Sequence, residues 1–208
     1  MVARTLSRQS ARNSPLHTVL NYGGMDPMEN LVLTALASGV TAADIRALVS
    51  EARDHGITTV VVPPHLLHVV GDQSGVQPSI RIISTSGWPS GNHHVLVKAA
   101  EARLAVQSGA EGVIFVPDLG QLDNQNALIT EIVTVRESVP HPAALIVALR
   151  GPNASMVQTA RMAGADQVLI IDAAPSDIAG IEGPAWAKGS DEAALLDAGA
   201  NKVLMERG

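Results

Sequence analysis

The chain has 208 residues, a formal net charge of −6 and no cysteine. These values exclude disulfides and thiolate metal sites, and the absence of a basic face excludes nucleic acid as an expected partner. No apolar run approaches the roughly 20 residues of a membrane span, so we expect a cytoplasmic protein with no membrane contact.

Residues 1–24 are the first predicted segment, a polar N-terminal arm that we expect to be disordered. The arm contains Arg4, Arg8 and Arg12 without a following apolar stretch, which distinguishes it from a secretory signal. An artefact of the start site is the alternative interpretation. We predict that residues 25–208 form one domain, because 46% of the chain is hydrophobic and this is enough for a substantial core.

One pattern recurs along the chain: a helix-like segment, then Gly or Gly-Ala, then a short apolar run. Its occurrences are Gly56 before 59–62, Gly109 before 113–116, Gly164 before 168–171, and Gly199 before 203–205. Glycine just after a helix relieves the left-handed conformation of that position. A run of four or so apolar residues is typical of a strand buried on both faces. Repetition of the two predicts parallel strands joined by crossover helices.

The remaining elements fit between these units. Further strands are predicted at 31–36, 79–84, 143–149 and 184–187, with helices that start near 41, cover 92–108 and cover 153–163. Strands and helices that alternate in this way predict an α/β fold, a TIM-type (β/α)8 barrel. An open doubly wound sheet is the alternative, but the number of sequential units favours closure, and no G-x-G-x-x-G motif follows the first strand.

Two parts of the barrel are predicted to be reduced. Residues 172–183 leave room only for a shortened sixth crossover helix, and the chain ends just after the eighth strand, so the eighth helix is expected to be missing. Both gaps would leave apolar barrel surface uncovered, and such patches usually mark an interface. We therefore expect a homo-oligomer such as a homodimer, a partner protein, or the N-terminal arm to cover these faces.

Several motifs between residues 34 and 171 carry a family resemblance. They are residues 41–48, the turn Ser86-Gly87-Trp88-Pro89-Ser90-Gly91, Lys98 with Glu101, Gly109-Ala110-Glu111, and Gly164-Ala165-Asp166. In these motifs the chain resembles the deoxyribose-phosphate aldolase family, class I aldolases that join acetaldehyde to glyceraldehyde 3-phosphate. The resemblance implies a TIM barrel with lyase ancestry over about two thirds of the chain.

The positions that carry this family's chemistry are apolar here. The resemblance places Leu169 where the family has its Schiff-base lysine, Ile114 at the aspartate of strand four, and Val32 at the aspartate of strand one. The family's second lysine falls near Trp186, with Lys188 two residues further on. A Schiff base needs an amine, and apolar side chains neither tune its pKa nor relay protons. We therefore predict that the family's reaction is absent.

Chemistry in a barrel takes place at the carboxyl ends of the strands, so polar residues there are the candidate site. The sharpest hypothesis is an acid–base site of Asp118, Arg150 and Asp172, since carboxylates beside a guanidinium can bind a polar substrate and move protons. The candidate substrate-binding residues are His65, Thr85, Ser86, Trp186, Lys188 and Glu206.

Simpler interpretations stand beside this hypothesis. Asp118 is also placed to cap a turn, and Arg150 with Asp172 to form a structural ion pair. Lys98 and Glu101, three residues apart on a helix, are expected to pair with each other.

Three functions remain open. The first is an enzyme repurposed for acid–base or templated lyase or cyclase chemistry on a small carbonyl compound, without a cofactor or a metal. The second is a pseudoenzyme that acts as a binding or structural subunit. The third is an aldolase that uses Lys188. A mouth plugged by side chains such as Trp186 and Phe115 would favour the second.

Overall fold

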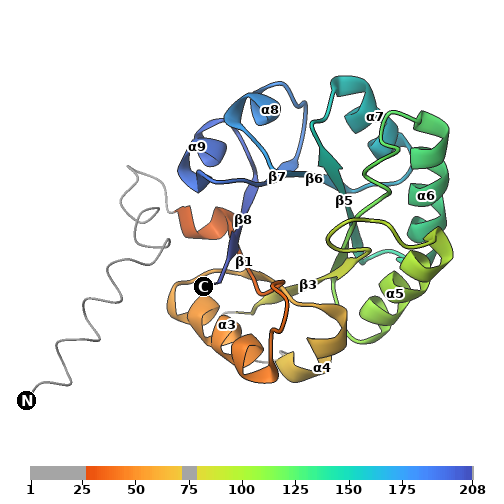
Figure 1. The fold of residues 1–208 in the computed structure, drawn as a ribbon. Helices are drawn as coiled ribbons and strands as arrows, with labels where there is room; N and C mark the ends of the chain where they lie inside the picture. Colours follow the sequence, from red (N-terminus) through yellow and green to blue (C-terminus); the bar gives the residue numbers. More distant parts are fainter. Residues whose placement is uncertain (1–26, 72–78, 208) are drawn as a thin grey trace, which may run out of the picture.

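The computed structural model describes residues 27–71 and 79–207, in which eight parallel strands close into a barrel with helices on the outside (Figure 1). The TIM-type prediction is confirmed; the predicted arm, residues 1–24, lies outside the described residues. The strands are β1 Leu31–Thr34, β2 Thr59–Val61, β3 Arg81–Ser86, β4 Gly112–Phe115, β5 Ala144–Arg150, β6 Gln167–Ile171, β7 Ala185–Lys188 and β8 Lys202–Glu206.

The helices alternate with these strands along the chain. They are η2 Pro27–Asn30, α3 Ala42–Asp54, η3 Pro64–Leu66, α4 Leu67–Val70, α5 Val95–Gln107, α6 Gln125–Ser138, α7 Ala154–Met162, α8 Pro175–Ala179 and α9 Glu192–Asp197. Short polar residues begin several of them: Thr41 and Asp44 form a capping box on α3, and Asn153 accepts a hydrogen bond from the third residue of α7. Such caps satisfy the amides that the first turn leaves unpaired.

The third strand differs from its prediction by two residues. The sequence predicts residues 79–84, whereas β3 spans Arg81–Ser86. The two added residues stay in the sheet because Thr85 and Ser86 pair with Ile114 and Phe115 of β4, and the Ser86 hydroxyl donates to the Lys98 carbonyl of α5. A polar side chain whose hydrogen-bonding groups are satisfied can be buried, so a strand can continue after its apolar residues end.

The core has two parts, which alternate along each strand. One set of side chains packs outward against the helices, and the other fills the inside of the barrel. The inner set is Val32, Val61, Ile83, Ile114, Val116, Ile146, Ala148, Leu169, Ile171, Trp186 and Leu204. Three partly buried residues from different loops, Leu36, Trp88 and Leu119, pack against this set. The interior is therefore an aliphatic core built around one indole.

The crossover between β6 and β7 contains only the five-residue α8. A groove of about 370 Å³ lies beside it, lined in part by Met162 and Ile181, and the Met162 side chain is 81% exposed. The other large exposed apolar side chains of the described residues lie elsewhere, on α5 and α6: Leu96, Val97, Leu104, Ile129 and Val133. The sequence reasoning did not predict this second surface. No helix in the described ranges is long and apolar enough to cross a membrane.

Candidate functional site at the barrel mouth

Arg150 and Asp172 meet at the mouth. The Nε atom of Arg150 lies 2.8 Å from a carboxylate oxygen of Asp172, and the two side chains are 54% and 72% exposed. The contact follows from the fold, since Arg150 ends β5 and lies opposite Ile171 at the end of β6. The expectation of an ion pair is confirmed. Exposed pairs of this kind contribute little to stability.

Asp118 does not join this pair. Its Oδ1 accepts a hydrogen bond from the Gly120 amide at 2.9 Å, and its Oδ2 accepts one from Nε2 of Gln121 at 2.8 Å. The bond from Gln121, followed by that from Gly120, lowers the pKa of the Asp118 carboxyl. A carboxylate held this firmly as an anion is a weak base at neutral pH.

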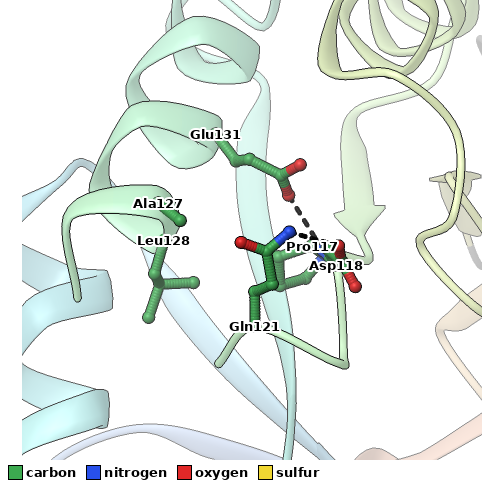
Figure 2. A pocket seen from close by; sticks show the side chains of 6 residues that line it. All are labelled: Pro117, Asp118, Gln121, Ala127, Leu128 and Glu131. Atoms are coloured by element: carbon green, nitrogen blue, oxygen red, sulfur yellow. Dashed lines mark hydrogen bonds between the residues drawn. The ribbon is translucent and has the colours of Figure 1, made fainter. Parts of the chain in front are cut away.

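The surroundings of Asp118 leave little room for a substrate (Figure 2). The pocket between Pro117, Gln121 and Glu131 measures about 20 Å³, enough for a single water. Within the described part of the chain, the hydrogen bonds of the Asp118 carboxylate stay inside its own loop. The geometry therefore supports the turn-capping interpretation of Asp118 and does not assemble the proposed acid–base trio.

Two candidate binding residues are engaged in structural hydrogen bonds. The Glu206 carboxylate accepts from the Thr34 hydroxyl at 2.7 Å and from the amides of Leu36 at 2.8 Å and Ala37 at 3.0 Å. Glu206 thereby fixes the loop that follows β1. Ser86 is fully buried and faces α5, on the opposite side of β3 from the barrel interior. The geometry therefore disfavours Ser86 as a residue that touches a ligand.

The other candidates line two separate cavities at the mouth. His65 and Thr85 line one of about 450 Å³, beside the loops after β1, β2 and β3. Lys188 and Asp172 line another of about 370 Å³, after β6 and β7. Trp186 lines neither cavity, because its side chain is only 1% exposed and belongs to the inner core. In the described ranges, no group of three His, Asp or Glu side chains is placed to hold a metal ion.

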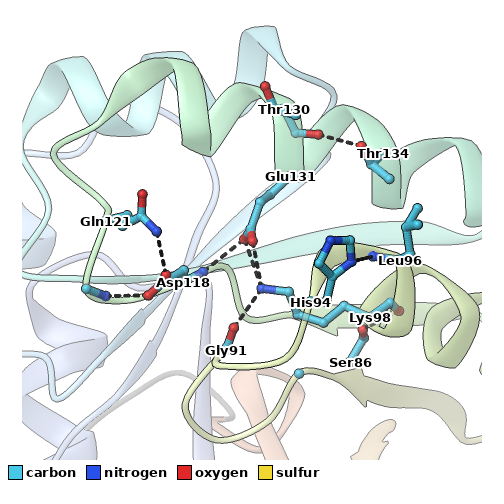
Figure 3. A network of polar contacts seen from close by, with 12 residues as sticks. Ser86, Gly91, His94, Leu96, Lys98, Asp118, Gln121, Thr130, Glu131 and Thr134 are labelled. Carbon is cyan, nitrogen blue, oxygen red and sulfur yellow. Dashed lines mark hydrogen bonds and ion pairs between the residues drawn. The ribbon is translucent and has the colours of Figure 1, made fainter.

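A polar network that the sequence did not predict ties the β3 loop to the β4 loop (Figure 3). Lys98 is fully buried; its Nζ donates to both carboxylate oxygens of Glu131, at 3.0 and 2.9 Å, and to the Gly91 carbonyl at 2.8 Å. Glu131 also accepts from the Asp118 amide at 2.9 Å. The predicted pair of Lys98 with Glu101 is wrong, because Glu101 turns instead to the Gly87 amide at 2.8 Å.

Comparison with known proteins identifies the relatives of this chain. A deoxyribose-phosphate aldolase of Nocardia farcinica is 41% identical over 143 residues, which are 65% of this chain and 62% of that protein. The aldolase of the same name from Corynebacterium jeikeium is 41% identical over 120 residues, 55% of this chain and 48% of that protein. This chain is related to the deoxyribose-phosphate aldolases. It spans about half to three fifths of the length of these curated relatives.

Solved aldolase structures share the fold along most of the chain. An aldolase named QR15 has a TM-score of 0.76 at 20% identity and covers 87% of this chain and 91% of that one. The deoxyribose-phosphate aldolase of Aeropyrum pernix, described as a tetramer, has a TM-score of 0.71 at 22% identity and covers 91% of this chain and 92% of that one. No protein-family model matches the sequence.

The positions that the aldolase resemblance marks as catalytic lie inside this barrel. Leu169 is fully buried and lies opposite Trp186 in the register of β6 with β7. Ile114 and Val32 are also fully buried and belong to the same inner cluster. At these four positions the aldolase-like barrel has packed side chains and no ionisable group.

Proposed function

We propose that this chain is an aldolase-type barrel without Schiff-base chemistry, and that it serves as a non-catalytic binding or structural subunit. The observation that carries the proposal is the filled interior. Leu169 and Trp186 pack side by side with at most 1% of either exposed, and the loops above them add Leu36, Trp88 and Leu119. An interior packed to this extent offers neither an amine nor room for a substrate.

The three lysines of the chain make this proposal sharply testable. Lys98 is buried and ion-paired, and Lys202 donates to the Glu29 carbonyl at the opposite end of the barrel from the mouth. Burial is the main factor that lowers the pKa of Lys202. Lys188 lines a mouth cavity, and its amine has no partner among the described residues. It is the one lysine placed to form a Schiff base at the mouth.

The experiment is reductive trapping with acetaldehyde and borohydride, read by intact mass and peptide mapping, together with an assay of deoxyribose 5-phosphate cleavage. We expect no cleavage and no adduct on Lys188 beyond the labelling of a short unstructured peptide that contains one lysine. The Lys188→Met variant is the matched blank. Turnover that disappears in this variant, with an adduct mapped to Lys188, would overturn the proposal and support an aldolase with a relocated lysine.

A second candidate function is favoured by the cavity of about 450 Å³ that contains His65 and Thr85. An imidazole and a hydroxyl that line one cavity can move protons on a small carbonyl compound, as expected of a repurposed lyase or cyclase. Deuterium exchange into small ketones, followed by NMR, tests this function. Exchange above the buffer rate that is lost in His65→Gln would establish it, and exchange equal to buffer with every compound would exclude it.

The subunit part of the proposal is supported by the apolar side chains exposed on α5 and α6, including Leu96 and Leu104. Monomeric proteins rarely expose contiguous apolar patches of large size. Assembly with a second copy or another protein stays a prediction, and sedimentation of the purified chain over a concentration series measures it. A monomer at every concentration would limit the proposal to assembly with a different protein.

A further inference from the structure

The cavity of about 450 Å³ beside β1, β2 and β3 has few charged side chains in its lining. Its lining comes from residues 36–40, 63–65, 85 and 88–89, together with Glu101 of α5. No lysine or arginine is part of this lining. Glu101 supplies the one carboxylate, and His65 is the one side chain able to carry a positive charge. A phosphate would bring up to about two negative charges to a wall without a permanent cation.

Three backbone amides near the cavity already have carboxylate acceptors. The amides of Leu36 and Ala37 donate to Oε1 of Glu206, and the Gly87 amide donates to Oε2 of Glu101. Oriented amides are the usual substitute for a cation in an anion site. Here three of them already donate to the carboxylates of Glu206 and Glu101, and Glu101 is the one permanently charged side chain of the lining.

The remaining lining fits the opposite charge. Trp88 is half-buried, packs against the inner core and lines the cavity, as does Glu101, whose carboxylate accepts from the amide of the residue before Trp88. An aromatic ring together with a carboxylate is the combination that recognises organic cations. The Thr85 hydroxyl also lines the cavity and has no hydrogen-bond partner among the described residues, so it is available to a polar group of a ligand.

We propose that this cavity binds a small organic cation, a compound with an ammonium or quaternary ammonium group, rather than a phosphate ester. Its volume lies within the range of small-molecule sites. The inference gives the proposed binding barrel a ligand class. The cation-binding inference depends on Glu101 and Trp88, whereas the trapping experiment measures the reactivity of Lys188. The inference and the proposed absence of Schiff-base chemistry can therefore fail independently.

The test uses choline chloride and its neutral carbon analogue, 3,3-dimethyl-1-butanol, titrated into the 208-residue chain by calorimetry. The two probes have the same shape and differ in charge. We expect choline to bind at least about tenfold more tightly than the analogue, and Glu101→Gln and Trp88→Leu each to weaken choline about tenfold. Glu137→Gln, the same charge change on an exposed residue of α6, is the matched control and should leave choline binding unchanged.

Three results would overturn the inference. They are equal binding of choline and the neutral analogue, displacement of choline by inorganic phosphate, and the absence of saturable choline binding. Glutamine at position 101 keeps an oxygen that can accept from the Gly87 amide, so the variant should fold, and its thermal unfolding checks this. If Glu101→Gln does unfold, Trp88→Leu, which leaves that bond in place, decides the question.

Discussion

Replacing Lys98 by methionine removes the centre of the network that joins the β3 and β4 loops. Methionine keeps an apolar stem near the Phe115 ring but deletes the amine that contacts Glu131 and Gly91. Breaking a buried ion pair costs about 3–5 kcal/mol. Because the Glu131 side chain is 18% exposed and keeps its bond from the Asp118 amide, we expect the low end of this range, about 3 kcal/mol. The melting temperature should fall by roughly 6–12 °C.

Urea unfolding and calorimetry measure this loss, and two further variants define its cause. Lys188→Met makes the same chemical change at an amine without a partner in the described chain, so we expect a change below about 0.5 kcal/mol. The double variant Lys98→Met/Glu131→Leu should lose less unfolding free energy than the sum of the losses of the two single variants, because it leaves no uncompensated charge. A loss below about 1 kcal/mol for Lys98→Met alone would refute the reasoning.

Three more predictions concern local structure. Thr41→Ala should cost about 1 kcal/mol by urea unfolding and, in an NMR titration, raise the pKa of Asp44, which the Thr41 hydroxyl holds below 3.8. A carboxyl whose pKa is lower in the folded state stabilises the fold at pH values above its unfolded pKa, and this stabilisation is lost as the pH falls through its folded pKa. The difference in the free energy of unfolding between variant and wild type should therefore narrow below about pH 4. Gly91→Ala should strongly reduce thermal stability, since its φ is +72° and a Cβ would lie 1.9 Å from the Pro117 carbonyl oxygen. Arg150→Ala should change the free energy of unfolding by less than about 1 kcal/mol, because its ion pair is exposed.

The fold was predictable from the sequence because the strands of a parallel barrel are buried on both faces. Runs such as 113–116 and 168–171 are continuously apolar for this reason, and the glycines before them mark the ends of helices. The prediction failed where polar side chains continue a strand. Thr85 and Ser86 extend β3 by pairing with β4, and the buried Ser86 hydroxyl donates to the Lys98 carbonyl, which no local pattern reveals.

The candidate site was less predictable, for a geometric reason. The strand-end rule places polar residues at the mouth, but alternation decides which of them face it. Thr85 lines a cavity while its neighbour Ser86 is buried against α5. The spacing of residues on one helix also cannot reveal a partner that lies far away in the sequence. It predicts a pair of Lys98 with Glu101, three residues away, whereas Lys98 pairs with Glu131 on the next helix.

The apolar interior of the barrel and the hydrogen-bonded loops at its mouth meet different physical requirements. A lysine or an aspartate inside a barrel needs a charged partner and several hydrogen bonds, whereas Leu169 and Ile114 need only to pack. Aliphatic side chains at these positions therefore need no polar partner inside the barrel. The loops have no such freedom, because Glu131, Glu101 and Glu206 each satisfy backbone amides there. The inner cluster of this barrel is apolar, whereas three carboxylates hold backbone amides at its mouth, and carboxylates placed there favour cations over anions.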